Sequence, residues 1–361
     1  MNKKLLFFVS DFKIGQSVLL TDQLLAISKS GIPYLAVSGD GEQEKGLKEK
    51  TAHLDVRRVQ GLDKHEKFCA LAKQLAKIIR EDGVDYVHVQ NNWQMMLVVY
   101  AKFVLLRDFR LKILYTLHGF RHNHPVKSQI ARVVIGTMLL LFASKVICMS
   151  SYLIDKFVFL GKKIVLLPLG ISDEYFADEH IELPKDGLQM VFPAQFRAGK
   201  NQDLLIRAFA RHIHQTGDTT SYLTLPGDGE LRGGIQELAR ELKIVDRVGF
   251  PGQCSKKEIL QLYLKCNIGL VSSNSETFGQ SIVEPFILGR CVLSTHVGIA
   301  NDILEDRVNG FFFDSEDELV EVFALLYNKP YLISNAGLIN YKKRSQFSWS
   351  KVTQQYVSLL S

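Results

Sequence analysis

The sequence predicts an α/β protein built of two parallel-sheet domains that face each other across a cleft. The chain has 361 residues, 47% of them hydrophobic, which is enough for two domains that each bury a core. Short apolar runs alternate with helix-like segments in both halves, and a polar stretch without periodicity, GISDEYFADEHIELPKDG, separates the halves. We therefore expect domains at 1–172 and 187–342, and a final segment, 343–361, that could fold back on the first domain.

The strands are predicted from apolar runs of the length that a buried parallel strand needs. In the first half these runs are 5–9, 34–38, 86–90, 112–118, 145–150 and 163–168. In the second half they are 188–194, 222–227, 248–252, 268–273, 291–295 and 310–314. Segments such as LDKHEKFCALAKQLAKIIRE, with apolar residues three and four apart, predict helices between them, and FSWSKVTQQYVSLLS predicts an amphipathic helix at the end. Because strands and helices alternate, ligands are expected at the carboxyl ends of the strands.

Cysteine usage and hydropathy indicate a cytoplasmic protein. The five cysteines have no CxxC pair and no metal-ligand spacing, a pattern typical of reduced thiols. The N-terminal apolar run, 5–9, is ended by Asp11 and is too short for a signal peptide, so we interpret it as a core strand. The longest uncharged apolar run, 133–143, is about half of a membrane span. We expect no integral membrane segment.

Positive charge is concentrated in the first half of the chain. Residues 1–180 carry 25 Lys and Arg against 18 Asp and Glu, whereas the remainder carries 19 against 20. Between residues 100 and 163 there are 11 basic residues and only two acids, Asp108 and Asp155. Nucleic acid is a weak candidate partner, because no aromatic-basic interleaving or zinc motif accompanies the charge. A solvated basic face, a buried helix with basic ends, and a helix around Lys127 and Arg132 lying on an anionic membrane all remain open.

The stretch SNSETFGQSIVEPFILGRCVLSTHVG (273–298) carries the clearest chemical signal. It follows a buried strand and contains two acids eight residues apart, Glu276 and Glu284. The pattern from Gly279 to Gly289 is helical, so the amides at its start would form an anion site where free N–H groups favour a phosphate. A carboxylate has two acceptor oxygens and suits the two hydroxyl donors of a vicinal diol. An acid on each side of a phosphate site therefore fits a nucleotide sugar, which has hydroxyl groups on both sides of its diphosphate. Two surface acids on a loop are the plain alternative, because the spacing alone is a weak pattern.

The same stretch resembles the E-x7-E signature of the retaining glycosyltransferases of family 4, two-domain enzymes of the GT-B fold that include many bacterial surface-glycan enzymes. Other segments resemble the family over nearly the whole chain. They are PAQFRAGKNQDLLIRAFA, LPGDGELR, VGFPG, LLPLGISDEYF, TLHGF and MSSYL. The resemblance implies two Rossmann-like domains, the first for the acceptor and the second for the nucleotide-sugar donor.

The resemblance also implies roles for single residues of the donor site. Glu276 would hold the hydroxyls of the transferred sugar, Glu284 the ribose diol, and Lys200 the departing diphosphate. Arg197 would be the second cation, although the family usually has its arginine two residues earlier, where this chain has Gln195. The remaining implied donor-binding residues are Gly15, Gly227, Thr277, Phe278, Gly279 and Gln280. On the acceptor side, His118 would face the reacting sugar, and with Glu276 and Lys200 it completes the expected catalytic set.

Plainer interpretations stand beside these roles. Lys200 and Arg197 could be solvated charges at a helix start, although cations are unfavourable there unless an anion joins them. His118 could be a core histidine, and Gly227 could serve only a turn. His88, His122 and His124 have no spacing that brings them together, so we assign them no metal.

The expected activity is a metal-independent, retaining transfer of a hexosyl group. No Asp-x-Asp motif occurs in the chain, which agrees with a scheme in which fixed cations and helix amides stabilise the leaving diphosphate. The expected donor is a nucleoside diphosphate sugar, with a UDP-sugar favoured, and the acceptor a glycan or lipid-linked molecule in surface polysaccharide or lipopolysaccharide assembly.

A nucleotide-sugar epimerase of the same shape and a non-catalytic nucleotide-sugar binding protein are the alternatives. An oxidoreductase is disfavoured because no GxGxxG follows the first strand. The expected location is the cytoplasmic face of the cell membrane, with peripheral contact to anionic lipid and no nucleic acid.

Overall fold

The structure is a computed structural model that describes residues 3–9, 16–38, 56–59, 68–118, 125–177, 183 and 186–360. The chain divides into two compact units. Unit 1 comprises Met1–Gly170 and Trp349–Ser361, and unit 2 comprises Ile171–Ser348. In the described part of the chain, no helix is both long and apolar enough to cross a membrane.

Unit 1 is built on a seven-stranded sheet with the order β3-β2-β1-β4-β5-β6-β7, in which every neighbouring pair is parallel. The strands are β1 (Leu5–Val9), β2 (Tyr34–Ser38), β3 (Val56–Arg58), β4 (Tyr86–Val89), β5 (Lys112–Leu117), β6 (Lys145–Cys148) and β7 (Ile164–Leu166). The main helices are α1 (Gln16–Lys29), α3 (Phe68–Asp82), α4 (Asn92–Tyr100), the π-helix η2 (Ala101–Leu106), α5 (Pro125–Phe142), α6 (Ser151–Ile154), η3 (Asp155–Lys163) and α14 (Trp349–Ser358).

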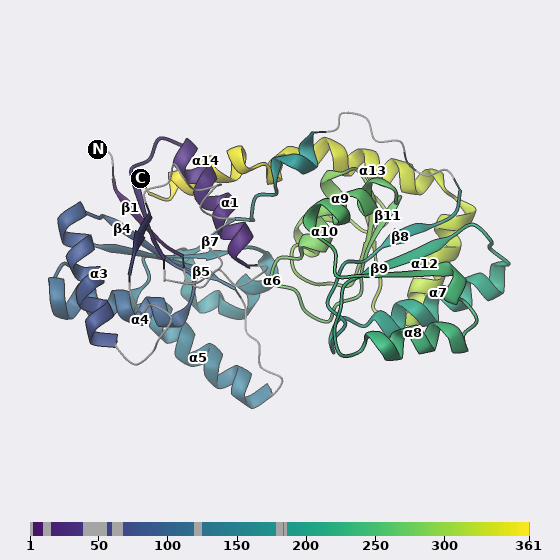
Figure 1. Cartoon of the computed structure of the whole chain (residues 1–361), viewed down its shortest axis with the longest axis horizontal. Helices are drawn as coiled ribbons and strands as arrows, with labels where there is room; N and C mark the ends of the chain where they lie inside the picture. Colours follow the sequence, from purple (N-terminus) through teal and green to yellow (C-terminus); the bar gives the residue numbers. More distant parts are fainter. Residues whose placement is uncertain are drawn as a thin grey trace. The chain divides into compact units, whose positions relative to one another are not determined.

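The sheet of unit 1 is covered on both faces because its strands alternate between two apolar clusters. Leu6 and Phe8 pack with the side of the sheet that carries α3, α4 and α5, whereas Leu5 and Phe7 pack with α1 and α14. This is the period of two that a strand imposes on its side chains. Figure 1 shows the two groups of helices on opposite faces of the sheet, and α14 lies against α1. The last helix of the chain thus completes the core of the first unit.

Unit 2 contains a six-stranded parallel sheet with the order β10-β9-β8-β11-β12-β13. Its strands are β8 (Gln189–Val191), β9 (Tyr222–Pro226), β10 (Val248–Gly252), β11 (Ile268–Val271), β12 (Cys291–Ser294) and β13 (Gly310–Phe312). Its main helices are η4 (Asp173–Phe176), α7 (Gln202–Thr216), α8 (Arg232–Glu241), η5 (Val245–Arg247), α9 (Lys256–Leu264), α10 (Gln280–Ile287), α11 (Ala300–Ile303), α12 (Glu316–Asn328), α13 (Tyr331–Lys343) and η6 (Arg344–Phe347). Helices α9, α10 and α13 lie on one face and α7, α8 and α12 on the other (Figure 1).

The strand order in each unit fixes where a ligand can bind. The order reverses direction between β1 and β4 in unit 1 and between β8 and β11 in unit 2. At such a switch point the two connections leave the sheet on opposite faces and open a crevice at the carboxyl ends of the strands. The loops that follow β8 and β11 carry Lys200 and Glu276, and those that follow β4 and β5 carry Gln90 and His118.

The predicted fold class, two parallel-sheet α/β domains, is confirmed, and one strand and the bounds of the units differ from the sequence-based expectations. Strand β3 was not predicted, because its three residues include Arg57 and Arg58. The segment interpreted as a linker begins with η4, whose Tyr175 is 2% exposed and packs with unit 2. Compact structure in unit 2 therefore starts at Ile171 and not at the predicted residue 187.

Candidate active site

The loops after β8 and β11 are tied together by hydrogen bonds between them. Ser272 is fully buried, and its hydroxyl donates to the backbone oxygens of Lys200 at 2.7 Å and Asn201 at 3.1 Å. In return the Asn201 side chain donates to the Ser272 oxygen at 3.0 Å. Thr295 donates to the Ser273 oxygen at 2.6 Å and adds the loop after β12 to the assembly. Because all three loops are cross-linked, the side chains they carry are held in fixed relative positions.

Lys200 and Glu276 form an ion pair within this assembly. The Lys200 ammonium donates to Glu276 Oε1, and the Ser273 hydroxyl donates to the same oxygen at 2.8 Å. The two side chains are only 13% and 17% exposed. A nearly buried ion pair of this kind is desolvated. Each charge is therefore a strong binding site for a polar ligand that takes the place of the other charge or binds beside it. The sequence predicted both residues, and the structure brings them into direct contact.

The N-terminus of α10 lies directly after this pair. Gly279 is the N-cap residue with φ of 90°, and among the described residues no side chain caps the helix. Its first amides are therefore available to an anion, and the helix dipole favours negative charge there. The backbone angle favours glycine at this position, and a Cβ there would also lie 2.6 Å from Ile282 Cδ1. Phe278 is buried and Thr277 and Gln280 are half-buried, so the predicted loop residues lie together at this helix start.

Glu284 lies about a turn and a half further along α10 and is half-buried. Burial raises the pKa of Glu284 to about 7, against the opposing effects of Lys256 and of Tyr175. The hydroxyl of Tyr175 is buried and has no hydrogen-bond partner of good geometry among the described residues, although Glu284 is near enough to help raise its pKa. This carboxyl and this hydroxyl are polar groups that the protein leaves incompletely satisfied, as expected of groups that bind a ligand.

Tyr175 is a candidate site residue, near Glu284, that the sequence analysis missed. It lies in η4, inside the segment that was interpreted as a linker, and η4 contacts α10. The only available signal was the pair of aromatic residues in DEYF within a stretch that is otherwise polar. Aromatic side chains in an otherwise polar linker indicate that the linker packs against a domain, and this inference would have identified Tyr175.

The glycine turn after β9 supports the loop that carries Arg197 and Lys200. Gly227 and Gly229 have φ of 139° and 153°, and a Cβ on them would lie 2.0 Å from the Ala194 oxygen and 2.3 Å from the Phe196 oxygen. The two loops are joined by a backbone hydrogen bond from Phe196 to Asp228 at 3.0 Å. The predicted residue Gly227 thus lies against the backbone of this loop. Arg197 is exposed, and its side chain has no ion pair or hydrogen bond among the described residues.

The predicted acceptor-side residue, His118, lies in unit 1 directly after β5. Its Nε2 lies 2.7 Å from Oε1 of Gln90, which follows β4, the neighbouring strand. Burial lowers the pKa of His118 to about 4, so the imidazole is neutral at neutral pH. Gly15, which was predicted to approach the diphosphate, lies outside the described residues, as do His122 and His124. Within the described ranges no group of three or more His, Cys, Asp or Glu residues could hold a metal ion.

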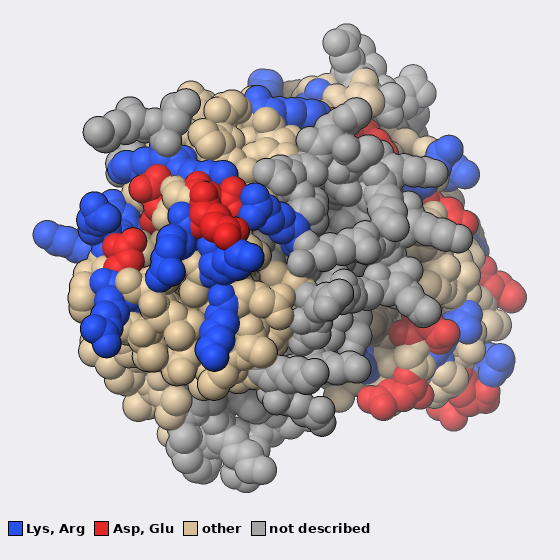
Figure 2. Space-filling view, turned by 60° about the vertical axis from the view of Figure 1, so that its left-hand side comes forward, with Lys and Arg blue, Asp and Glu red and all other residues tan. Residues whose placement is uncertain are grey.

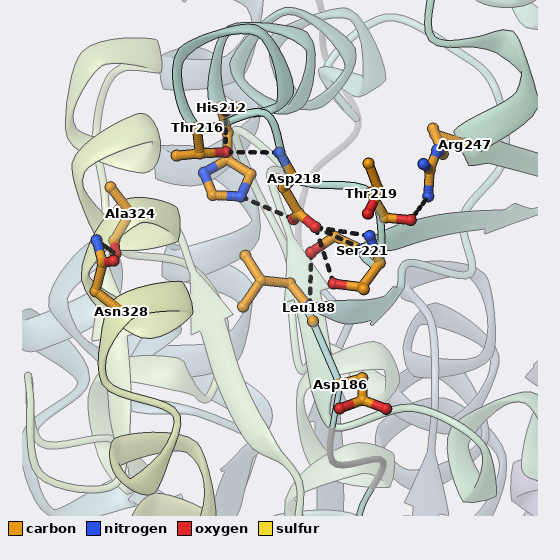
Figure 3. A network of polar contacts seen from close by, with 12 residues as sticks. Asp186, Leu188, His212, Thr216, Asp218, Thr219, Ser221, Arg247, Ala324 and Asn328 are labelled. Atoms are coloured by element: carbon orange, nitrogen blue, oxygen red, sulfur yellow. Dashed lines mark hydrogen bonds and ion pairs between the residues drawn. The ribbon is translucent and has the colours of Figure 1, made fainter.

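A second buried polar cluster in unit 2 lies at the opposite edge of the sheet. His212 Nε2 lies 3.2 Å from Asp218 Oδ2, and Asp218 Oδ1 accepts hydrogen bonds from Thr220 and Ser221 (Figure 3). These residues connect the end of α7 to the start of β9, and the Ser221 hydroxyl accepts a hydrogen bond at 2.7 Å from the backbone N–H of Leu188, directly before β8. Since ligands bind at the carboxyl ends of the strands, this cluster stabilises the fold and takes no part in the site.

Comparison with known proteins identifies the class of enzyme. Residues 15–175 match the family model "Glycosyltransferase Family 4", and residues 174–345 match the model "Glycosyl transferases group 1". EpsD of Bacillus subtilis (strain 168), a glycosyltransferase by provisional name, is 24% identical over 310 residues, which cover 81% of this chain and 80% of that protein. The chain spans a smaller part of some other relatives. The D-inositol 3-phosphate glycosyltransferase of Thermobifida fusca (strain YX) is 26% identical over 176 residues, 46% of this chain and 41% of that protein.

Solved structures show the same fold. The chain superposes on Alr3699/HepE of Anabaena in complex with UDP with a TM-score of 0.79 and 21% identity, covering 99% of both chains. A glycosyltransferase from Rickettsia africae ESF-5 gives a TM-score of 0.78 with 18% identity over 99% of this chain and 97% of the other. At these identities the structures establish the fold, and the two family models, which together run from residue 15 to residue 345, carry the assignment. The chain belongs to the glycosyltransferases of family 4, with their two-domain GT-B fold.

Proposed function

We propose that this glycosyltransferase is a retaining, metal-independent enzyme that moves a hexosyl group from a nucleoside diphosphate sugar, preferably a UDP-sugar, to a glycan or lipid-linked acceptor in surface polysaccharide or lipopolysaccharide assembly. One observation carries the proposal. The Lys200–Glu276 pair lies immediately before the N-terminus of α10, which no side chain caps in the part of the chain that the structure describes, and Glu284 and Tyr175 lie beyond it. Groups for a sugar, an anion and a diol thus follow one another in the order in which a nucleotide sugar presents those parts.

The pair suits the bond-breaking step. Cleavage of the bond between the sugar and the diphosphate places negative charge on the leaving phosphate. The Lys200 ammonium and the first amides of α10 would stabilise this charge without rearranging, because the hydrogen bonds of Ser272 and Asn201 hold the loop of Lys200. Glu276 would accept hydrogen bonds from the sugar hydroxyls in place of the one it now accepts from Lys200. Retention would follow if the departing phosphate oxygen takes the acceptor proton on the same face.

Glu284 and Tyr175 suit the ribose. A carboxylate accepts two hydroxyl hydrogen bonds, and the Tyr175 hydroxyl can donate or accept another. Helix α10 carries both the amides for the phosphates and Glu284, so a ribose would bind about a turn and a half from the diphosphate. Nothing in this geometry selects among bases, and the preference for uridine rests on the HepE complexes with UDP and UDP-glucose.

We further propose that unit 1 contacts anionic lipid through α5 and η3. Exposed apolar side chains gather there, with Val133 and Val134 63% exposed, Leu141 65% and Val158 67%. Phe159 of η3 packs on α5 at Gly136, where a Cβ would lie 2.2 Å from its ring, so the two elements form one surface. Arg132 lies on α5, and Lys156, Lys162 and Lys163 lie on η3. Figure 2 shows lysine and arginine side chains interspersed with aspartate and glutamate on the side of unit 1 that it brings forward. Apolar residues flanked by cations fit an anionic bilayer better than they fit water. The enzyme would then work at the cytoplasmic face of the membrane.

The test is a donor screen with matched controls. The purified protein is incubated with UDP-, GDP- and ADP-sugars and a lipid-linked acceptor extract, and the anomeric configuration of any product is determined. Transfer with retention, abolished in Glu276→Ala, supports the proposal. A changed sugar formed without acceptor would indicate the epimerase, and donor binding without any product would indicate a binding protein. Product of inverted configuration would overturn the retaining assignment.

A further inference from the structure

The segment that follows β12 is joined at both of its ends to the loop that follows β11. At the start of the segment the Thr295 hydroxyl donates to the Ser273 oxygen at 2.6 Å. At its end the backbone N–H of Ile299 donates to the Phe278 oxygen at 2.9 Å. His296 lies between these two anchors, so its backbone is held beside the loop that carries the acid proposed to bind the sugar.

The backbone of His296 is close to Glu276. A Cβ on Gly298 would lie 3.0 Å from Glu276 Cβ, so the two segments are in direct contact at this point. His296 precedes Gly298 by two residues, and consecutive Cα atoms are about 3.8 Å apart, so its Cα lies within about 7.6 Å of that of Gly298. The imidazole is therefore within reach of a ligand that Glu276 binds.

The ring of His296 is held in place by its neighbours. It stacks on the ring of Phe312, at the end of β13, with centroids 4.1 Å apart and 13° between the planes. Its Nδ1 lies 3.0 Å from Asn301 Oδ1. The backbone N–H of Val297 donates to the Thr295 oxygen at 2.8 Å, which places His296 at the apex of a three-residue turn. An imidazole fixed by a stack, a hydrogen bond and a tight turn is preorganised for a ligand.

The second ring nitrogen of His296 is available to that ligand. Of residues 291–300, His296 alone is exposed, and its Nε2 has no hydrogen-bond partner among the described residues. A hydroxyl donates to a nitrogen that carries no proton and accepts from one that does. A hydroxyl therefore suits Nε2 in either tautomer of the ring, whereas a phosphate oxygen suits it only when Nε2 carries a proton.

We propose that His296 is a specificity-determining residue of the sugar site: its Nε2 forms a hydrogen bond with one hydroxyl of the transferred sugar. This inference rests on the proposed function, which places that sugar at Glu276. The strand order gives the direction, because the loops of Lys200, Glu276 and His296 follow β8, β11 and β12, which are successive neighbours in the sheet. A sugar held by Glu276 thus has the cation for the diphosphate on one side and the imidazole on the other.

A comparison of donor and UDP affinities separates a sugar contact from general damage. The probes are UDP and whichever of UDP-glucose, UDP-galactose and UDP-N-acetylglucosamine wild type binds most tightly, titrated by calorimetry without acceptor. His296→Ala should weaken the UDP-sugar by about tenfold, the loss of one hydrogen bond, and leave UDP unchanged because UDP has no sugar. His296→Gln should keep most of the affinity, since its amide can donate or accept.

His214→Ala is the matched control. His214 is also an exposed histidine of unit 2, but it lies in the last turn of α7, at the opposite edge of the sheet. This variant should bind both ligands as wild type does. Equal losses of UDP and UDP-sugar affinity in His296→Ala would overturn the inference, because they would show that the imidazole does not act on the sugar.

Donors that lack one sugar hydroxyl at a time identify the group that binds His296. Removal of that hydroxyl should cost wild type about tenfold in affinity and His296→Ala little, because the variant has already lost the partner. Losses that are the same in both proteins at every position would overturn the inference. Glu276→Ala tells this failure from that of the proposed function. If it leaves the ratio of UDP-sugar to UDP affinity unchanged, the proposed function is contradicted. If it lowers this ratio and His296→Ala does not, only the role of His296 is.

Discussion

Lys200 donates a hydrogen bond to Glu276 from a loop 76 residues away in sequence, and Ser273 donates to the same carboxylate oxygen. The two charges neutralise each other where both side chains are largely buried. A nucleotide-sugar donor brings an anion for Lys200 and hydroxyl groups for Glu276. The pair can therefore separate without leaving either charge unpaired. This exchange makes different predictions for the two acids of the site.

Glu284→Ala should weaken the binding of free nucleoside diphosphate and of donor together. Glu284 would hold the ribose, which does not react, so its hydrogen bonds contribute equally to both ligands. Losing hydrogen bonds to a charged group costs roughly 1.5–3 kcal/mol, or about ten- to a hundredfold in affinity. Calorimetric titration of UDP into wild type and variant measures the loss. Equal UDP affinity in the two proteins would contradict the ribose role.

Glu276→Ala should leave the affinity for UDP unchanged or raise it. UDP has no sugar for Glu276 to hold, and removal of the carboxylate frees Lys200 for the diphosphate. The loss should appear in kcat, because positioning of the sugar matters most as its bond to phosphate breaks. Steady-state rates and the same titration decide the matter, and the assignment of roles is wrong if Glu276→Ala weakens UDP as much as Glu284→Ala does.

Gly298→Ala should damage the site without a direct contact to substrate. Gly298 has φ of 54°, and a Cβ there would lie 2.5 Å from the Phe278 oxygen and 3.0 Å from Glu276 Cβ. The added methyl group should displace the loop of Glu276, so kcat should fall by about tenfold or more. Gly217→Ala is the control, since Gly217 has a similar φ of 67° and no atom of the described residues lies within 4 Å of the added Cβ. Equal losses of activity in the two variants would point to backbone strain alone.

Activity should survive chelation of divalent ions. The proposed scheme stabilises the leaving diphosphate with Lys200 and the amides of α10, and the chain contains no Asp-x-Asp motif. Turnover measured in excess EDTA should match turnover in untreated buffer to within about twofold. A loss that magnesium or manganese restores would show that a cation shares the diphosphate with Lys200.

Much of the fold could be predicted from the sequence because buried parallel strands appear as short apolar runs. In the run LLFFV, Leu5 and Phe7 point to one core and Leu6 and Phe8 to the other, so these four successive residues are all apolar. Strand β3 could not be found in this way. It is an edge strand of its sheet, and its Arg57 pairs with Asp82 of α3 at 2.7 Å, so no apolar run marks it.

The candidate site could be predicted only where the pattern is local. Glu276, Gly279 and Glu284 lie on one loop and helix, so the sequence places them near one another directly. The contacts that complete the site join distant segments. The pairing of Lys200 with Glu276 and the approach of Tyr175 to α10 each depend on how helices pack on a sheet. No periodicity in the sequence specifies such packing.

Asp218→Asn should lower the stability of the protein most at neutral pH. Burial opposes ionisation of Asp218, but hydrogen bonds from Ser221 and Thr220 lower its pKa to about 2, below its ordinary value of 3.8. Its ionised form therefore contributes about 2 kcal/mol above pH 4, and this contribution is lost as pH falls from 4 to 2. Urea unfolding of wild type and variant at pH 7 and pH 3 measures the difference. A difference that does not shrink at pH 3 would contradict the shifted pKa.

His212 should add to acid sensitivity at higher pH. Burial lowers the pKa of His212, although Asp218 opposes the shift, so the unfolded chain binds a proton near pH 6.5 that the folded chain does not. Stability therefore falls as pH decreases below 6.5. His212→Gln should flatten this part of the curve between pH 7 and pH 5. An unchanged slope would mean that other groups cause the acid sensitivity.

Unit 1 should bind anionic vesicles through the surface formed by α5 and η3. Each cation near the membrane adds about 1 kcal/mol, which salt screens, and the exposed apolar side chains add a part that salt does not screen. Flotation with phosphatidylglycerol vesicles should thus recover most of the protein at low salt and less at high salt. Serine at Val134, Leu141 and Phe159 should reduce binding at both salt concentrations. The three serines leave the charge of the protein unchanged, so the variant tests the apolar side chains alone. A variant that floats as well as wild type would exclude this surface as the membrane contact. Wild type that binds neutral vesicles as well as anionic ones would also exclude it.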